Sequence, residues 1–324
     1  MKAVLCKAYG MPETLVIEEV EPLRAGKGQV VVEVKACGVN FPDTLIIQGK
    51  YQFKPAMPFS PGSEVAGIVK EVGEGVKGIS VGDHVIASTG WGGFAEEVVA
   101  DAAKIIPMPA GLDFTIASAF VLTYGTAHHA LKDRAQMQSG ETLLVLGAAG
   151  GVGIAAIEIG TQLGARVIAA ASSDQKLEVC RQHGASETIN YASEDLRERI
   201  KQTTGGQGVD VIFDPVGSSY SEPALRSMAW KGRFLVVGFA GGEIPRIPLN
   251  LTLLKGCSIV GVFWGAFTER EPQRNQENLQ ELMNWLSQGI LKPHISATYP
   301  LERAADALYD MLNRKVLGKA VLVP

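Results

Sequence analysis

A glycine-rich turn, Ala148–Gly153, is the first stretch of the chain whose residue types and spacing point to chemistry. An apolar run, Leu143–Gly147, precedes it, and an apolar helical pattern follows it as far as Gly164. Strand, glycine turn and helix in this order form the unit that binds the pyrophosphate of a dinucleotide at the start of the helix. The turn therefore predicts phosphate contacts from Ala149, Gly150, Gly151, Val152 and Gly153.

The glycines of this turn have separate roles. Gly150 and Gly151 have no Cβ, so the backbone can approach a pyrophosphate closely, and Gly153 lets the helix pack tightly on the strand. The first glycine of the dinucleotide pattern is replaced by Ala148. A tight turn between strand and helix in another doubly wound fold therefore stays open as an alternative.

The residues at the end of the next strand indicate which dinucleotide binds. An NAD site usually carries Asp or Glu there, about twenty residues after the turn, to bind the ribose 2′-hydroxyl. This chain has Ser172 at that position and Lys176 shortly after it, and both suit a 2′-phosphate. Asp174, two residues later, is a counter-signal. We predict that NADPH binds in preference to NADH.

Length and composition limit the possible folds and partners. The 324 residues predict two domains, and 46% hydrophobic with 20% charged residues is typical of a globular protein with a large core. A net charge of −4 argues against nucleic acid or an anionic membrane as a partner. The N-terminus has no signal-peptide pattern, and no apolar run is long enough to span a membrane. Four scattered cysteines indicate reduced thiols in a cytoplasmic protein: Cys6, Cys37, Cys180 and Cys257.

The elements that position the chemical groups are of two kinds. Residues 1–110 are short runs of β-branched residues between glycines and prolines, which predict a compact barrel. A helix is expected over residues 113–135 with Asp113 as its N-cap, and from there strands and helices alternate as in a parallel sheet covered on both faces. A later helix is expected to be capped by Ser193, and the final strand, 319–324, could rejoin the barrel.

Motifs along the chain carry a resemblance that covers essentially its whole length. They are CGVNFPDTLIIQGKY, PFSPGSEVAGIVKEVG, VGDHVIA, TYGTAHHAL, GAAGGVG, GVDVIFDPVG and GKAVLVP. With them the chain resembles the medium-chain dehydrogenase/reductase superfamily, specifically its zinc-free NADPH:quinone oxidoreductase branch, which includes zeta-crystallin. The resemblance implies an α/β fold, with a Rossmann doubly wound parallel sheet over residues 122–264 and a GroES-like β-rich barrel domain over 1–121 and 265–324. It also implies a homodimer formed through the sixth strand.

The same resemblance bears on metal binding. Zinc alcohol dehydrogenases carry a Cys at the position of Asn40 and a His at the position of Ser63, and they have a four-cysteine lobe that this chain lacks. Because a catalytic zinc needs three protein ligands, the resemblance implies a site without metal. None of the five histidines stands in ligand spacing with a cysteine.

A site without metal must polarise the electron acceptor through hydrogen bonds. The resemblance implies that residues 40–51 lie beside the nicotinamide. Asn40 would then offer an amide to a ribose or substrate oxygen, and Tyr51 would offer a phenol to a developing oxyanion. Asp43 is a third catalytic candidate, with a helix-capping carboxylate as the alternative. Bacterial quinone reductases of this branch often carry a second tyrosine where this chain has Leu45, so the quinone assignment stays open.

Further cofactor contacts are implied by the resemblance alone. They lie in the helix between the domains, after later strands and near the end of the chain: Thr126, Tyr191, Gly238, Phe239, Phe263, Trp264, Gly265, Arg314 and Lys319. Tyr191 would lie near the adenosine phosphate beside Lys176. Trp264 could instead be a core aromatic, and Arg314 and Lys319 could simply be exposed and solvated.

Together these features predict an NADPH-dependent, zinc-independent reductase that transfers hydride to a quinone or an α,β-unsaturated carbonyl. Its partner would be a small-molecule substrate, with no nucleic acid and no membrane. One alternative is an enoyl thioester reductase, which Tyr51 favours. The other is an NADPH-binding protein without a major catalytic role, and the acidic charge balance argues against RNA binding by such a protein.

Overall fold

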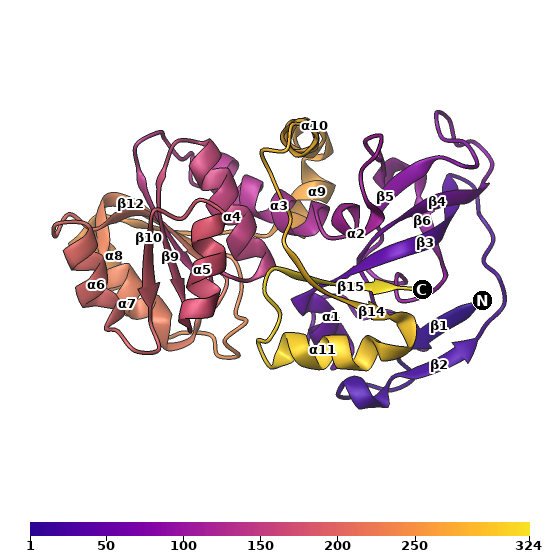
Figure 1. Cartoon of the computed structure of the whole chain (residues 1–324), viewed down its shortest axis with the longest axis horizontal. Coiled ribbons are helices and arrows are strands. Elements are labelled where there is room, and N and C mark those ends of the chain that lie inside the picture. The colour runs from indigo at the N-terminus through magenta and orange to yellow at the C-terminus, as the bar shows by residue number, and fades with distance from the viewer. The chain divides into compact units, whose positions relative to one another are not determined.

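The computed structural model describes all 324 residues, and its contacts divide the chain into two compact units (Figure 1). The first unit comprises Met1–Leu122 and Pro293–Pro324, and the second comprises Thr123–Lys292. The first unit thus divides from the second after residue 122, where the sequence predicts a boundary after residue 121. The predicted return at residue 265 differs from the structure, because residues 265–292 belong to the second unit.

The second unit is built on a parallel sheet of six strands in the order β10-β9-β8-β11-β12-β13. The order reverses between β8 and β11, and ligands of open α/β sheets bind at such a switch point. This is the predicted doubly wound arrangement, which is confirmed. The strands are β8 (Thr142–Leu146), β9 (Arg166–Ala171), β10 (Glu187–Asn190), β11 (Val209–Asp214), β12 (Met228–Val236) and β13 (Ser258–Gly261).

Helices cover both faces of this sheet. Figure 1 shows α4 and α5 on one face and α6, α7 and α8 on the other. Since both faces are covered, a central strand such as β8 reads as an apolar run, and its Leu143–Leu146 have no exposed surface. The helices are α3 (Val121–His128), α4 (Gly151–Gln162), α5 (Asp174–Gln182), α6 (Leu196–Thr203), α7 (Ser221–Arg226) and α8 (Asn250–Lys255).

Two predictions about helices need correction. The helix expected over 113–135 is interrupted: α2 (Phe114–Ala117) ends before α3, and a π-helical turn, His129–Arg134, follows α3. Asp113 does cap α2, as predicted, because its carboxylate accepts from Thr115 N and Ile116 N. Ser193 does not cap α6. The carboxylate of Asp195 accepts from Glu198 N at 2.8 Å instead, because the chain is still in a turn at residue 193.

The first unit contains a mostly antiparallel sheet in the order β14-β15-β3-β4-β5-β7, with β6 also paired to β3, and a separate β1-β2 pair. The final strand, β15, pairs with β3, which confirms that the end of the chain rejoins the N-terminal sheet. The strands are β1 (Lys2–Leu5), β2 (Val16–Glu19), β3 (Gln29–Val39), β4 (Glu64–Val72), β5 (His84–Ser88), β6 (Glu97–Asp101), β7 (Ile105–Pro107), β14 (Ile295–Pro300) and β15 (Lys319–Val323). Its longer helices are α1 (Phe41–Ile46) and α11 (Ala304–Leu312).

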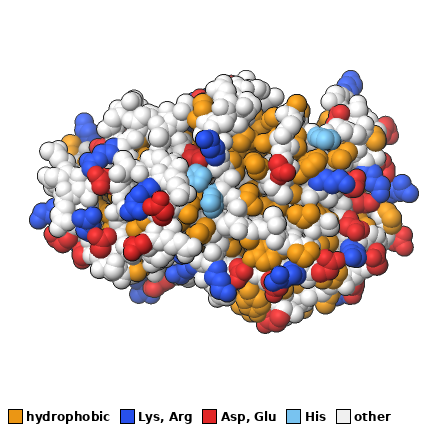
Figure 2. Space-filling model, in the orientation of Figure 1, with side chains coloured by type: hydrophobic (Ala, Val, Ile, Leu, Met, Phe, Trp, Pro, Cys, Tyr) orange, Lys and Arg blue, Asp and Glu red, His pale blue; other side chains and the backbone are white.

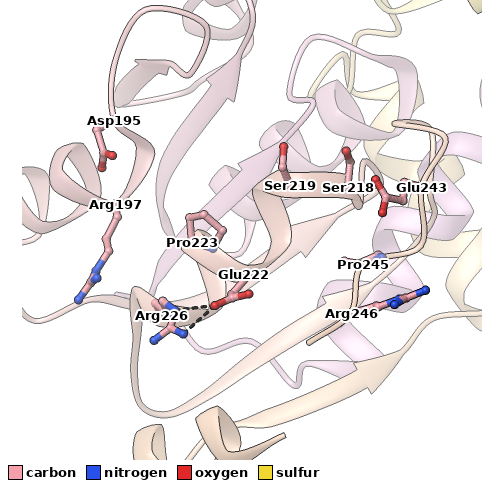
Figure 3. Close-up of a pocket in the computed structure, with 10 residues that line it drawn as sticks. All are labelled: Asp195, Arg197, Ser218, Ser219, Glu222, Pro223, Arg226, Glu243, Pro245 and Arg246. Atoms are coloured by element: carbon pink, nitrogen blue, oxygen red, sulfur yellow. Dashed lines mark hydrogen bonds and ion pairs between the residues drawn. The ribbon is translucent and has the colours of Figure 1, made fainter. Parts of the chain in front are cut away.

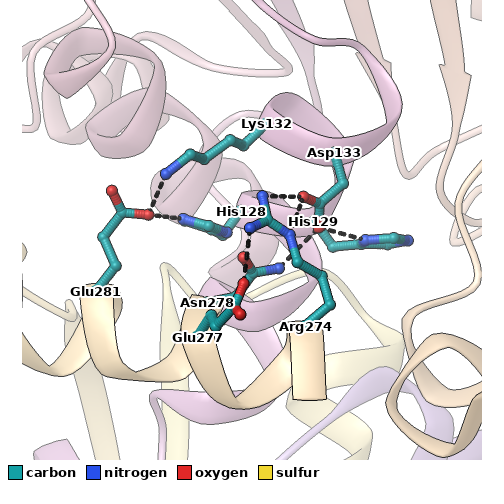
Figure 4. Close-up of polar contacts among 8 residues, drawn as sticks. All are labelled: His128, His129, Lys132, Asp133, Arg274, Glu277, Asn278 and Glu281. Atoms are coloured by element: carbon teal, nitrogen blue, oxygen red, sulfur yellow. Dashed lines mark hydrogen bonds and ion pairs between the residues drawn. The ribbon is translucent and has the colours of Figure 1, made fainter. Parts of the chain in front are cut away.

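Polar contacts with residues 128–133 hold α10 (Pro272–Ser287) in the second unit, together with α9 (Trp264–Arg270), which directly precedes it (Figure 4). Glu281 on α10 lies 2.7 Å from His128 Nε2 and also pairs with Lys132. Asp133 accepts from Asn278 Nδ2 at 2.7 Å. Burial alone would raise the pKa of Asp133, but its hydrogen-bonding partners lower it to about 2. These contacts join residues far apart in sequence, so composition alone could not reveal them.

Two general features of the molecule bear on partners. None of its helices combines the length and apolar character needed to cross a membrane. On the face drawn in Figure 2, acidic and basic side chains are interspersed and form no basic stripe.

Candidate active site

The turn between β8 and α4 has the geometry of a phosphate cradle. Gly147 has a φ of +56°, and a Cβ there would lie 2.6 Å from a methyl carbon of Val216. Gly147 is therefore the glycine that makes the tight turn, one residue before the replaced position at Ala148. Sequence reasoning missed it, although it directly follows the apolar run that predicts the strand.

The next glycines shape the start of α4. A Cβ on Gly153 would lie 2.6 Å from the carbonyl oxygens of Gly147 and Ala148, so only glycine allows the helix to pack this closely on the turn, as predicted. Gly150 is the N-cap residue, and α4 runs for 12 residues from Gly151. The first N–H groups of a helix have no partner within it, so they can bind an anion.

An aspartate at the end of β11 holds the neighbouring turn in place. Asp214 is buried, and its Oδ1 accepts from Val216 N at 2.9 Å and Gly217 N at 2.8 Å. Its Oδ2 accepts from Ser221 Oγ at 2.6 Å. The turn that packs against Gly147 is thus fixed at the switch point of the sheet. Sequence reasoning did not single out Asp214, although a carboxylate at the end of a buried strand is a signal.

The predicted 2′-phosphate residues come together at the end of β9. Lys176 Nζ donates to Ser172 Oγ at 3.1 Å. Tyr191 N donates to Ala171 O at 3.1 Å, which brings Tyr191 beside Ser172. The counter-signal, Asp174, accepts from Asn190 Nδ2 at 2.8 Å, so a residue of the protein already binds its carboxylate.

Aromatic residues follow the last two strands of the sheet. Phe239 and Phe263 are 37% and 49% exposed, which is unusual for side chains of this size and suits contact with a ligand. Trp264 is half-buried, and its indole lies over α3, where a Cβ on Gly125 would come within 2.8 Å of the ring. The structure thus brings Trp264 next to Gly125, the residue before Thr126. Gly238, which follows β12 and precedes Phe239, donates its backbone N–H to Asp214 O at 3.3 Å.

A pocket of about 510 Å³ lies elsewhere on the second unit (Figure 3). Three arginines line it, but so do three acidic residues, and Arg226 is paired with Glu222 at 2.7 Å. The lining therefore offers no net charge that would select an anion. Sequence reasoning singled out none of its residues: Asp195, Arg197, Ser218, Ser219, Glu222, Pro223, Arg226, Glu243, Pro245 and Arg246.

The catalytic candidates of the first unit are gathered at the start of α1. Asp43 Oδ2 accepts from Asn40 N at 2.7 Å, and its Oδ1 accepts from Gly62 N at 3.2 Å. This is the helix-capping role that the sequence left as an alternative. Burial raises the pKa of Asp43 to about 7, although these two hydrogen bonds and the charge of Lys319 act in the opposite direction.

Asn40 is fully engaged by the protein. Its Nδ2 donates to Gly38 O at 3.2 Å and Glu64 Oε1 at 3.0 Å, and its Oδ1 accepts from Lys319 Nζ at 2.5 Å. The prediction that this amide donates to a ribose or substrate oxygen is therefore not supported by the geometry. Lys319 is only 4% exposed, so it is not a solvated surface cation either. Arg314, by contrast, is exposed.

The first unit does not fit a catalytic zinc ion. No three His, Cys, Asp or Glu residues are clustered so that they could hold a metal. Glu64 is completely buried and its charge is met by Lys319 at 2.9 Å. Burial and nearby carboxylates raise the pKa of Cys37 well above its usual value, so this thiol keeps its proton. Zinc would require thiolate, imidazole or carboxylate ligands, and none is arranged for it.

Tyr51 retains the properties of a proton donor. Its side chain is half-buried, and its ring makes an edge-on contact with Phe53 at 5.9 Å between centroids. Burial, and secondly the charge of Asp43, raise the pKa of the Tyr51 phenol. The phenol is therefore protonated at neutral pH and can donate to an anionic oxygen.

Comparison with known protein families matches both units. Residues 26–110 match the family described as alcohol dehydrogenase GroES-like domain, and residues 151–288 match the family described as zinc-binding dehydrogenase. The quinone oxidoreductase-like protein 2 homolog of Nematostella vectensis is 41% identical over 325 residues, which cover 99% of this chain and 88% of that protein.

Solved structures agree with these matches. The quinone oxidoreductase of Escherichia coli, complexed with NADPH, superposes with a TM-score of 0.92 at 31% identity, and the match covers 100% of both chains. The enoyl reductase CurK superposes with a TM-score of 0.89 at 27% identity, covering 99% of this chain and 98% of that one.

Proposed function

Because this chain belongs to the quinone oxidoreductase family of the medium-chain dehydrogenase/reductase superfamily, we propose that it is an NADPH-dependent reductase of quinones or α,β-unsaturated carbonyls. The observation that carries the proposal is the glycine cradle at β8–α4 together with Ser172 and Lys176 at the end of β9. This combination suits the phosphates of NADPH. The relatives named above are oxidoreductases, which supports an enzyme over a protein that only binds the dinucleotide.

The second unit would hold the cofactor. The residues of the cradle, 149–153, would bind the pyrophosphate, and Ser172, Lys176 and Tyr191 would bind the adenosine 2′-phosphate. The aromatic residues after β12 and β13 would contact the rest of the dinucleotide. When bound, NADPH supplies a hydride from its nicotinamide ring. The remaining proposed contacts are Thr126, Gly238, Phe239, Phe263, Trp264, Gly265 and Arg314.

The first unit would act on the acceptor. We assign the proton or hydrogen bond to the Tyr51 phenol, which is half-buried, lies within reach of the charge of Asp43 and carries its proton at neutral pH. Asp43 would hold the start of α1 through its bonds to Asn40 N and Gly62 N. With no ligand set for zinc in this unit, stabilisation of the developing oxyanion depends on such hydrogen bonds.

A second candidate activity is the reduction of enoyl thioesters. Two observations favour it: the phenol of Tyr51, and Leu45 where bacterial quinone reductases often carry a second tyrosine. An enoyl ester needs more proton assistance than a quinone, and an apolar pocket suits an acyl chain. The likeness to CurK, an enoyl reductase, points the same way.

We also propose a homodimer and a cytoplasmic location. Strand β13 pairs only with β12, so its other edge is unpaired. Next to this sheet, three leucines of the α8 segment are 68–79% exposed: Leu249, Leu253 and Leu254. Such a patch is typical of a surface that binds another protein, and we assign it to a second copy of the chain. All four cysteines are free, as expected in a reducing compartment.

The proposal is tested by measuring the initial rate of NADPH oxidation with a panel of acceptors. The panel contains a p-quinone, an o-quinone, an enone and an enoyl-CoA ester. Turnover with a quinone or enone that exceeds turnover with the enoyl ester supports the leading assignment. Preference for the enoyl ester supports the second candidate, and no oxidation with any acceptor would refute both.

A further inference from the structure

Lys319, the first residue of β15, has an almost completely buried ammonium group. Nζ donates to Asn40 Oδ1 at 2.5 Å, Glu64 Oε1 at 2.9 Å and Val39 O at 3.1 Å. These three oxygens use all three hydrogens of the ammonium. A charge buried to this extent is costly unless it is paired and fully hydrogen-bonded, so the surroundings of Lys319 are built to hold a cation.

The fold places this ammonium through strand register. Ala320 is paired with Val39 in the antiparallel β15–β3 ladder, so the next pair brings Lys319 opposite Asn40 on the same face. Gly318 makes the entry possible: its φ is +64°, and a Cβ there would lie 2.2 Å from His294 O. Lys319 N also donates to His294 O at 2.8 Å, which fixes where the strand begins.

A glycine also makes room for the partner carboxylate. On β3, a Cβ at Gly38 would lie 2.9 Å from Glu64 Oε1 and 2.2 Å from Ser118 O. Without that Cβ, the Glu64 carboxylate reaches Lys319 and Asn40 with one oxygen. Its other oxygen accepts from Leu122 N at 3.0 Å. Both Glu64 oxygens therefore accept hydrogen bonds from the protein.

We propose that Lys319 is a positioning residue of the reductase: its ammonium serves as the internal cation of the first unit and holds Asn40, and through Asn40 the start of α1, in the geometry that Tyr51 requires. The inference rests on the proposed function. The contacts form a chain from Lys319 to Asn40 Oδ1, and from Asn40 N to Asp43. Helix α1 spans Phe41–Ile46, and Tyr51 follows in the bend after the helix.

The buried ion pair lies beside the positions at which zinc alcohol dehydrogenases carry ligands. The positions that carry Cys and His in zinc alcohol dehydrogenases are Asn40 and Ser63, and the carboxylate next to them, Glu64, is neutralised by Lys319. A fixed ammonium brings the single positive charge that the buried carboxylate needs. All three N–H donors of this ammonium are bound by oxygens of the protein.

The test uses three variants of the full-length protein. Lys319→Met removes the charge but keeps a side chain of similar length. Because it leaves Glu64 buried and unpaired, this variant could fail to fold, so Lys319→Met/Glu64→Gln removes both charges together. The matched control is Lys70→Met, which removes the lysine that pairs with the nearly buried Glu97 in the same unit.

Three measured quantities decide the matter. Amide hydrogen exchange of the segment 40–51 reports on positioning without any turnover, and kcat is compared with the Kd for NADPH. For the double variant we expect exchange in this segment to be about tenfold faster or more and kcat to fall at least about tenfold, while the Kd for NADPH stays within about twofold. The control should match the wild type in all three.

Wild-type exchange and wild-type kcat in the double variant would overturn the inference and reduce Lys319 to a structural ion pair. A fall in kcat matched by an equal loss of NADPH affinity would overturn it too, because Lys319 would then act on the cofactor. If the wild-type protein oxidises no NADPH with any acceptor, the proposed function fails, and hydrogen exchange alone decides whether Lys319 positions α1.

Discussion

At the scale of single residues, the account depends on a phenol that keeps its proton. Burial and the nearby carboxylate of Asp43 both disfavour ionisation of Tyr51. The sequence alone singles out the segment 40–51, which carries Tyr51, as part of the candidate site. It also singles out Ser172 and Lys176. The burial of Lys319 and the full engagement of Asn40 could not be predicted, because both depend on which strand lies opposite which.

Replacing Tyr51 by Phe should lower kcat about ten- to a thousand-fold while the Kd for NADPH changes little, since the lost interaction forms mainly in the transition state. The loss should be larger with an enone or enoyl-CoA ester than with a quinone. Steady-state kinetics with each acceptor measure this, with Tyr9→Phe, an exposed tyrosine of the same unit, as the control. Wild-type turnover on all acceptors would leave Tyr51 only an aromatic wall of the pocket.

Asp43 should make the free energy of unfolding depend on pH. Its pKa is about 7 in the folded protein and 3.8 for an ordinary carboxyl, so the folded state binds the proton more tightly. Stability is then greatest below pH 4 for this group and falls as pH rises to about 7, by about 4 kcal/mol at most. Urea unfolding between pH 4 and 7.5 should show a flatter profile for Asp43→Asn. Parallel profiles of the variant and the wild type would contradict this.

Lys176 should determine the choice between the two dinucleotides. One charge-assisted contact to the 2′-phosphate is worth about 1.5–3 kcal/mol, so Lys176→Ala should weaken NADPH binding about ten- to a hundred-fold and leave NADH binding nearly unchanged. Isothermal titration with both cofactors measures the ratio. Lys201→Ala on α6, an exposed lysine of the same unit, is the control. An equal effect on both cofactors would rule out a 2′-phosphate contact.

At the scale of elements, local pattern predicted most strands and helices, and tertiary contacts decided the exceptions. The apolar run of β8 was recognisable because the strand is buried on both faces. Its glycine turn was recognisable because a Cβ would clash with neighbouring atoms there. The final strand also has a readable pattern, and it does pair with β3. The place of α9 and α10 was not predictable, because Glu281 and Asp133 form their contacts across about 150 residues of sequence. The cap of α6 moved from Ser193 to Asp195 because helix starts are set by the exact turn geometry.

The exposed leucines of α8 should be buried between two copies of the chain. The double substitution Leu253→Glu/Leu254→Glu places charge in that patch and should convert a dimer to a monomer. Light scattering after size-exclusion chromatography gives the mass, with Val81→Glu, at an exposed apolar residue of the first unit, as the control. A wild-type protein that is already monomeric at micromolar concentration would contradict the proposed dimer.

At the scale of the whole molecule, the two units divide the proposed work. The second unit offers a cradle for phosphates at the switch point of a parallel sheet, and the first offers a protonated phenol held near a buried ion-pair network. Length and the change of sequence pattern after residue 110 predict two domains, and the contacts divide the chain into two units. The fine shape of the acceptor pocket could not be predicted, because it depends on loops whose conformation local sequence does not fix.

The most direct measurement of the central claim is kcat/KM for NADPH and for NADH, with a quinone and an enone as acceptors, before and after exhaustive treatment with a zinc chelator. We expect kcat/KM to be about tenfold or more higher with NADPH than with NADH, and unchanged by the chelator. Equal values for the two cofactors, or activity that disappears with the chelator and returns with added zinc, would contradict the account of a zinc-independent NADPH reductase.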